Sequence, residues 1–149
     1  MTTTLKWTTP ESIGTALDSG LNSLGDGNTA LSAAIDNLTD LYTLVDLELV
    51  LASVDLSAQT KLWISVWFIT TVDGSNYEDG SAGTPGTVPS RPPDAVFPLR
   101  KVNAAQRINI TNIPVPPYSG KLLLQNNAGA ALASSGNTLK YRRHTQQGV

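Results

Sequence analysis

The stretch LVDLELVL at residues 44–51 decides the fold class. Every second residue from position 45 to position 51 is Val or Leu, and Asp46 and Glu48 stand between them. Successive side chains of a β-strand point to opposite faces, so this stretch has one apolar face and one acidic face. The pattern predicts a strand that lies between a buried core and solvent.

A second stretch, KLWISVWFIT at residues 61–70, alternates as well, but both of its faces are largely apolar. One face carries Leu62, Ile64, Val66 and Phe68, and the other carries Lys61, Trp63, Ser65, Trp67 and Ile69. A strand with two apolar faces is covered on both sides. We therefore expect a central or interface-forming strand here.

Shorter candidate strands follow the same logic at residues 29–36, 96–99, 106–110, 121–125, 130–133 and 138–142, each bounded by Gly, Pro, Asn or Ser. About eight short strands with turn residues between them predict an all-β protein, an antiparallel β-sandwich of jelly-roll type. We assign this β-sandwich domain to residues 28–149. Residues 1–27 are expected to form an N-terminal arm with at most a short helix.

Composition supports this fold class. The 149 residues are 40% apolar and 15% charged, with 12 Gly, 9 Pro and no Cys. This is the composition of a loop-rich globular domain without disulfides. The N-terminal residues lack the apolar segment of a signal peptide, and no apolar run is long enough to cross a bilayer, so we expect a soluble protein.

Charge is unevenly distributed along the chain. Residues 1–80 contain eleven acidic and two basic side chains, whereas residues 81–149 contain eight basic side chains and one acidic side chain. Two interpretations stay open: the halves interleave and their charges mix, or the surface has opposite poles that pair with other copies or with a charged lattice.

The inventory of reactive residues is poor. The chain has a single histidine, His144, and lacks any nucleophile or phosphate-loop motif. Because His144 follows Lys140, Arg142 and Arg143, we interpret it as part of a solvated basic tail. The twelve carboxylates single out no glycosidase-type pair. We expect no catalytic residues, no metal and no cofactor.

The stretch TVDGSNYEDG at residues 71–80 invites comparison with a calcium loop. An EF-hand needs oxygen ligands at positions 1, 3 and 5 and Gly at position 6, but Tyr77 and Glu78 occupy positions 5 and 6 counted from Asp73. A different calcium site remains an alternative. Asp-Gly pairs form turns, so we interpret the stretch as the start of a long Pro- and Gly-rich loop at residues 73–93.

Two further features allow alternatives. Trp63 and Trp67 share one strand face, and they are either core residues or an open platform for a protein or a sugar. The C-terminal TLKYRRHTQQGV alternates as a last strand with one wet face. Together with a pI near 5.2, this argues against nucleic-acid binding.

Several of these motifs together resemble small structural proteins of tailed bacteriophages that decorate or cement the capsid. The resemblance covers roughly residues 28–149, through YTLVDLELVLAS, KLWISVWFITT, DGSNYEDG and the late PVPPYSGKLLLQNNAGAALASSGNTLKYRRHTQQGV. It implies a jelly-roll-like sandwich present in many copies on a virion, with no catalytic residues to carry over.

We therefore expect a non-enzymatic capsid cement or decoration protein on the virion surface, assembled in the bacterial cytoplasm. Its expected partners are the major capsid protein and itself, as a dimer or trimer, and not nucleic acid, a membrane or a small-molecule substrate. The expected interface residues are Leu5, Trp7, Ile13, Leu17, Trp63, Trp67, Tyr77, Glu78, Asp79, Arg91, Arg142 and Arg143. The alternatives are a carbohydrate- or receptor-binding module of a phage fibre, and a tail or adaptor protein.

Overall fold

The computed structural model describes residues 3–148, which form antiparallel β-sheets with one short 3-10 turn and no α-helix. The prediction of an all-β, antiparallel protein is confirmed. The elements are β1 (Leu5–Trp7), β2 (Gly14–Leu17), η1 (Ser19–Leu21), β3 (Thr29–Leu31), β4 (Leu44–Asp55), β5 (Trp63–Thr70), β6 (Ala95–Pro98), β7 (Asn103–Pro114), β8 (Gly120–Asn127), β9 (Thr138–His144) and β10 (Gln146–Gly148).

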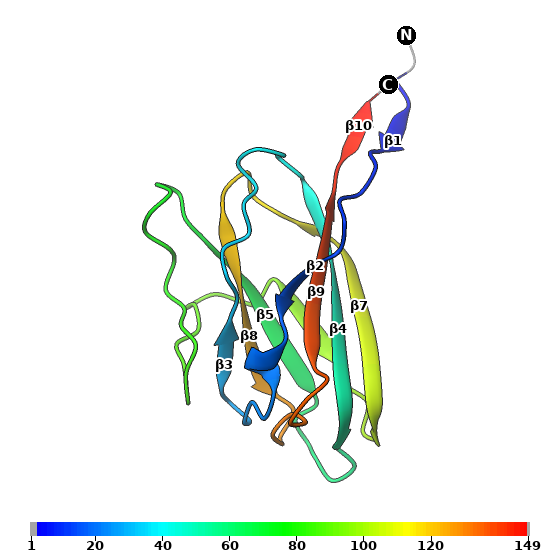
Figure 1. The fold of residues 1–149 in the computed structure, drawn as a ribbon, viewed down its shortest axis with the longest axis vertical. Coiled ribbons are helices and arrows are strands. Elements are labelled where there is room, and N and C mark those ends of the chain that lie inside the picture. The colour runs from blue at the N-terminus through cyan, green and yellow to red at the C-terminus, as the bar shows by residue number, and fades with distance from the viewer. Residues whose placement is uncertain (1–2, 149) are drawn as a thin grey trace.

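These strands make two four-stranded sheets and one two-stranded ribbon. The first sheet has the order β2-β9-β4-β7, the second has the order β3-β8-β5-β6, and β1 pairs with β10. Figure 1 shows the two sheets side by side along the body, while the β1-β10 ribbon projects from one end with both termini at its tip. We call β1 and β10 together the terminal ribbon.

The alternation that predicted β4 also explains the core. Val45, Leu47, Leu49 and Leu51 are at most 1% exposed. They share one apolar cluster with residues of the second sheet, among them Ile64 and Phe97. Burying a Leu or Phe side chain contributes about 1.5–3 kcal/mol relative to leaving it exposed, so this cluster dominates the stability of the body.

The second apolar face of β5 has its own cover. Trp67, Ile69 and Leu123 form a separate buried cluster against Tyr77 and Val88, which belong to the loop after β5. The prediction that β5 is covered on both sides is confirmed. The loop lies on the sheet instead of extending away from it.

One strand prediction is wrong. Residues 130–133 form no strand, because buried asparagine amides hold this segment as a loop. Asn126 Nδ2 donates to the carbonyl oxygens of Leu24 and Ala130, both at 2.8 Å, and the Leu132 backbone N–H donates to Leu24 at 3.0 Å. The apolar residues at 130–133 therefore belong to a loop whose Leu132 side chain is buried, 4% exposed, and they do not form a strand.

Residues 3–27, which we assigned to an arm, contain β1, β2 and η1. β2 pairs with β9 at the edge of the first sheet, and Leu17 and Leu21 join the core cluster. Residues 3–13 contribute no strand to the two four-stranded sheets.

Candidate interaction surface

The terminal ribbon is exposed along its whole described length. All six residues of β1 and β10 are exposed, and Leu5 and Trp7 are 71% and 55% exposed. An isolated two-stranded ribbon is only marginally stable in water. Here Thr8 and Thr145, at its base, strengthen it, because the Thr8 N–H donates to the Thr145 carbonyl at 2.9 Å and the Thr8 hydroxyl donates to the same oxygen at 3.0 Å.

Other exposed apolar side chains lie at the same end of the molecule. Leu38 and Leu41 belong to the segment between β3 and β4, and Tyr118 belongs to the segment between β7 and β8. The first segment ends and the second begins where β9 continues into the ribbon, since Leu44 pairs with both His144 and Pro114. Leu38 and Leu41 are more than half exposed and Tyr118 is 38% exposed. We call Leu5, Leu38, Leu41 and Tyr118 the ribbon-end patch.

Near the end of β9, Arg143 contacts segments that are distant in the sequence. Its guanidinium forms a bidentate ion pair with Glu11, with Nε–Oε1 at 2.8 Å and Nη2–Oε2 at 2.7 Å, and Nη1 donates to the Asp36 carbonyl. The hydrogen bonds to Glu11 are the main cause that raises the pKa of Arg143 above its ordinary value. Arg143 therefore holds Glu11 and the 36–37 backbone against β9 as a permanently charged group.

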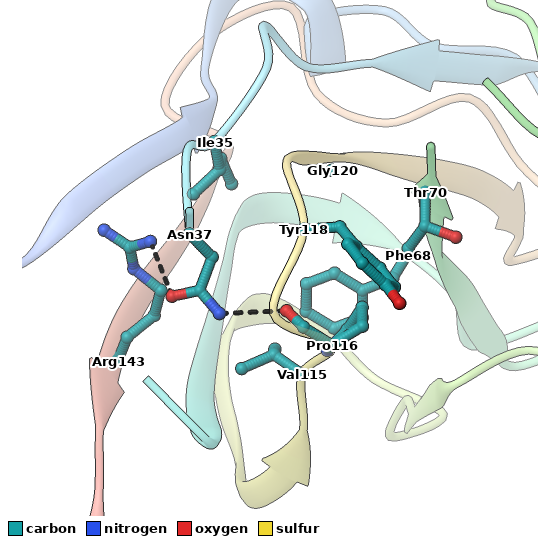
Figure 2. A pocket seen from close by; sticks show the side chains of 9 residues that line it. All are labelled: Ile35, Asn37, Phe68, Thr70, Val115, Pro116, Tyr118, Gly120 and Arg143. Carbon is teal, nitrogen blue, oxygen red and sulfur yellow. Dashed lines mark hydrogen bonds between the residues drawn. The ribbon is translucent and has the colours of Figure 1, made fainter. Parts of the chain in front are cut away.

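Asn37 extends the hydrogen-bond network of Arg143 to the segment that contains Pro116 (Figure 2). It accepts from Arg143 Nη1 at 3.3 Å, and its Nδ2 donates to the carbonyls of Tyr42 and Pro116, both at 2.9 Å. A small cavity of about 20 Å³ lies beside it, lined among others by Ile35, Phe68 and Tyr118. Such a volume holds at most about one water molecule, so this cavity is a packing defect and not a ligand pocket.

A larger groove runs over the outer face of the first sheet at the base of the ribbon. It has a volume of about 300 Å³ and is lined by Trp7, Pro10, Asp46, Thr111, Asn112 and His144. We call this the basal groove. Its polar side chains come from β4, β7 and β9, which lie next to one another in the sheet.

A β-bulge shapes the basal groove. Between the pairs Val45–Ile113 and Leu47–Ile110, Asp46 alone faces two residues of β7, Thr111 and Asn112. Asn112 has a left-handed backbone with φ of 61°, and its N–H donates to Asp46 Oδ1 at 2.8 Å. Bulges of this kind redirect side chains and occur often beside functional sites.

His144 forms the floor of the basal groove. It is 5% exposed, its Nε2 lies 3.1 Å from Asp46 Oδ1, and the Trp7 ring stands on it edge-to-face at 5.0 Å between centroids. Its Nδ1 is buried without a hydrogen-bond partner in residues 3–148. The interpretation of His144 as part of a solvated tail is wrong, because β9 continues to this residue and Trp7 covers it.

A second, smaller groove adjoins the first. It has a volume of about 160 Å³ and shares Asp46 and Thr111 with the basal groove. Its other lining residues include Ile13, which is 64% exposed, and the charged Glu48. Glu48 pairs with Arg107 at 3.3 Å, so acidic side chains of the first half of the chain and basic side chains of the second half meet on this sheet.

Two sets of hydrogen bonds fix the loop 71–93, one within the loop and one between the loop and the second sheet. Asp73 Oδ1 accepts from the N–H groups of Ser75 and Asn76 at 2.8 and 2.7 Å, and the Asn76 contact is the main cause that lowers the pKa of Asp73 far below its ordinary value. This is the geometry of an Asx turn, in which a carboxylate caps backbone N–H groups.

Arg91 makes the second set of interactions. It forms a bidentate pair with Glu78 at 2.6 and 3.0 Å, contacts both oxygens of Asp94 at 3.0 and 2.9 Å, and donates to the Phe68 carbonyl at 2.7 Å. The hydrogen bonds to Glu78 are the main cause that raises the pKa of Arg91. Glu78 is thus already paired within its own chain.

The two strand tryptophans do not form a common platform. Trp67 is 5% exposed, and its indole Nε1 donates to the Arg91 carbonyl at 3.1 Å beneath the loop. Trp63 is 39% exposed at the start of β5. Of the two alternatives for these tryptophans, Trp67 is a core residue and not part of an open platform.

The structure distributes the other expected interface residues over several places. Leu17 and Arg143 are buried, Tyr77 packs under Lys121 at 4.2 Å, and Asp79 and Arg142 are exposed. Sequence reasoning missed the groove residues Asp46, Thr111 and Asn112. Asp46 was noticed only as part of an acidic strand face, and nothing in the sequence marks the bulge.

Within residues 3–148, no group of three or more His, Asp or Glu side chains is arranged to hold a metal ion. This part of the chain also contains no helix with the length and apolar character needed to span a bilayer.

Fold and surface together define an all-β protein with antiparallel sheets, an exposed terminal ribbon and a groove at its base. Neither a protein-family model nor a curated protein sequence matches this chain.

Proposed function

We propose that this chain is a non-enzymatic virion structural protein that decorates a bacteriophage capsid and docks on the major capsid protein through its ribbon-end patch. The observation that carries the proposal is the gathering of exposed Leu5, Leu38, Leu41 and Tyr118 at the end from which the terminal ribbon projects. Exposed apolar surface that gathers in one region of a molecule often marks a protein interface.

The finer fold that accompanies this proposal is a jelly-roll sandwich. If β2 to β9 are counted from one to eight, the two sheets have the orders 1-8-3-6 and 2-7-4-5. Consecutive strands thus alternate between the sheets, except for strands four and five, which are neighbours in the second sheet, and this is the connectivity of two interlocked Greek keys. The jelly roll is a common fold of viral capsid domains, and this agrees with the bacteriophage resemblance.

The exposed N-terminal segment supports the arm in this proposal. The terminal ribbon reaches beyond the two sheets, and within residues 3–148 the edge of β1 that faces away from β10 has no strand partner. An unpaired strand edge can accept a strand of a neighbouring chain. Repetition of a weak contact over many capsid sites would give strong overall binding, and a dimer or trimer would add to it.

Capsid binding tests the proposal directly. Purified protein should co-sediment with capsids assembled without it and raise the temperature at which they are disrupted. Leu38→Ser and Tyr118→Ser should weaken both effects. The exposed, distant Val96→Thr serves as a matched control. The proposal fails if the protein does not co-sediment, or if capsid stability is the same with and without it.

A further inference from the structure

We propose that the basal groove is a saccharide-binding site that takes a neutral pyranose ring, stacked on Trp7 and hydrogen-bonded to Asp46 and Thr111. Such a site is independent of capsid docking, because it lies on the outer face of the first sheet and shares no residue with the ribbon-end patch. It also differs from the platform that Trp63 and Trp67 would have made.

The aromatic part of the groove suits one face of a sugar ring. Trp7 is 55% exposed, yet its ring is held by the edge-to-face contact with His144 and by the pairing of β1 with β10. A fixed, flat and half-exposed indole offers a large apolar surface at a small cost in conformational entropy. The apolar C–H face of a pyranose is flat and has a matching size.

The polar part of the groove has unused hydrogen-bonding capacity. Asp46 uses Oδ1 for the Asn112 N–H and for His144 Nε2, whereas its Oδ2 accepts no hydrogen bond from residues 3–148. In the same part of the chain, the Thr111 hydroxyl and the Asn112 amide group also have no partner. An acceptor, a hydroxyl and an amide beside an aromatic ring match a ligand with several neighbouring hydroxyl groups.

The same groups argue against other ligand classes. Within the basal groove an anion would face the Asp46 carboxylate, because the basic side chains of Lys140 and Arg142 line the adjoining groove and His144 is buried and already bonded to Asp46. A purely apolar ligand would cover Asp46, Thr111 and Asn112 without satisfying them, and an unsatisfied buried polar group costs about 1–3 kcal/mol. A neutral polyol with one apolar face satisfies both halves of the groove.

The backbone indicates that this geometry is built and not incidental. The bulge at Thr111 and Asn112 places two consecutive β7 residues opposite Asp46, and the left-handed Asn112 is held by Asp46 itself. Bulges re-aim side chains and are over-represented next to functional sites. The adjoining groove of about 160 Å³ shares Asp46 and Thr111 but is also lined by the charged Glu48, Lys140 and Arg142, so the match to a neutral ring applies to the basal groove alone.

The test is an NMR titration of the full-length ¹⁵N-labelled protein with maltotriose, cellotriose and chitotriose, and with trigalacturonic acid as the anionic comparison. We expect at least one neutral trisaccharide to shift the amide signals of residues 7, 46, 111, 112 and 144 saturably, with a millimolar Kd. Trp7→Ala should weaken this binding about tenfold, which corresponds to the loss of an aromatic contact worth about 1.4 kcal/mol. Thr111→Val, which keeps the shape and removes the hydroxyl, should weaken it severalfold.

Trp63→Ala is the matched control, because it removes an exposed tryptophan away from the groove, and it should leave the Kd unchanged. Each variant must retain the dispersed spectrum of the folded protein, and Thr111→Val provides the test if Trp7→Ala does not. Three results would overturn the proposal. The first is no shift with any neutral sugar at tens of millimolar, and the second is an affinity of both Trp7→Ala and Thr111→Val equal to that of the unmodified protein. The third is binding of trigalacturonic acid at the same amides as tight as that of the neutral sugars.

Discussion

Arg143 connects three separate segments of the chain. It binds the Glu11 carboxylate, the Asp36 carbonyl and Asn37, and it lies 4.9 Å from the Tyr42 ring centroid. Because its side chain is 10% exposed and that of Glu11 is 16% exposed, water screens this pair only weakly. A single buried cation thus joins the N-terminal segment, the 32–43 segment and the last strand of the first sheet.

Removal of this cation should be strongly destabilising. Arg143→Ala leaves the Glu11 carboxylate buried without compensation, and we expect a loss of about 3 kcal/mol in the free energy of unfolding. Urea denaturation measures it. Arg107→Ala, which removes an exposed arginine paired with Glu48, should change the free energy of unfolding by at most about 0.5 kcal/mol. Equal losses in the two variants would show that Arg143 has no special role.

Asp73 should make the start of the loop sensitive to acid. Hydrogen bonds from Asn76, Ser75 and Thr71 lower its pKa in the folded state below the value of about 3.9 that an unfolded chain would have. A lowered folded-state pKa stabilises the turn above pH of about 3.9, and this contribution is lost as the pH falls through the folded-state pKa. A ¹³C NMR titration should find the Asp73 carboxylate still ionised when ordinary aspartates are half protonated.

The variant Asp73→Ala should remove this acid dependence of the turn. Amide hydrogen exchange of residues 75 and 76 should become fast at all pH values, because both N–H groups lose their acceptor. Asp79→Ala, at the other end of the same stretch, serves as the control. Protection of residues 75 and 76 that survives in Asp73→Ala would contradict the assignment of the turn to this carboxylate.

At the scale of elements, the loop 71–93 behaves as part of the second sheet. Its Tyr77 and Val88 cover Trp67, Ile69 and Leu123, and Arg91 fixes it to the Phe68 carbonyl of β5. The loop also reaches the edge strand β3, where Thr29 and Gly83 bond to each other. A long segment without regular strands is therefore fixed at several points, and it shields both a sheet face and a strand edge.

This cover should open when its clamp is removed. In Arg91→Ala, Glu78 and Asp94 are left as neighbouring carboxylates without their shared cation, and Trp67 loses part of its cover. We expect proteinase K to cleave within residues 79–90 severalfold faster than in the unmodified protein, with the body still folded by circular dichroism. Lys101→Ala, which removes an exposed cation from the β6-β7 turn, should not change the cleavage rate. Equal cleavage rates in both variants would exclude Arg91 as the clamp.

Elements could be predicted from sequence where alternation alone determines them. The strands at β4 and β5 follow from alternation, as do β8 and β9, since their inward side chains belong to the core. β2 could not be found, because Gly14, Thr15 and Ala16 give no apolar contrast and the strand is formed by pairing with β9. Conversely, the apolar residues around Leu132 predicted a strand in a segment that asparagine amides hold as a loop.

At the scale of the whole molecule, the all-β class was predictable and the groove was not. The basal groove joins β1, β4, β7 and β9, and its residues Trp7, Asp46, Thr111 and His144 are separated by tens of positions in the chain. Their proximity depends on strand order and on the register shift opposite Asp46, neither of which single-sequence alternation encodes. Of the ribbon-end patch, Leu5 was among the expected interface residues, whereas Leu38, Leu41 and Tyr118 were missed because they lie in segments without periodicity.

A substitution at Leu41 can test the ribbon-end patch without lowering the free energy of unfolding. This residue is exposed and has a left-handed backbone with φ of 52°, which costs a branched, non-glycine residue about 1 kcal/mol. Its side chain therefore contributes little to the folded monomer, and Asn, which tolerates the left-handed region, should be accepted there. We expect Leu41→Asn to leave the free energy of unfolding unchanged or to raise it by about 0.5 kcal/mol.

Capsid binding should respond in the opposite direction. If the ribbon-end patch docks on the capsid, Leu41→Asn removes apolar contact area from the interface, and co-sedimentation should fall while the sugar titration of the basal groove stays unchanged. Val96→Thr removes an exposed apolar group from the outer face of β6 and should affect neither measurement. Full capsid binding by a stably folded Leu41→Asn protein would remove Leu41 from the docking surface. A loss of sugar binding in the same protein would show instead that the patch and the groove are one site.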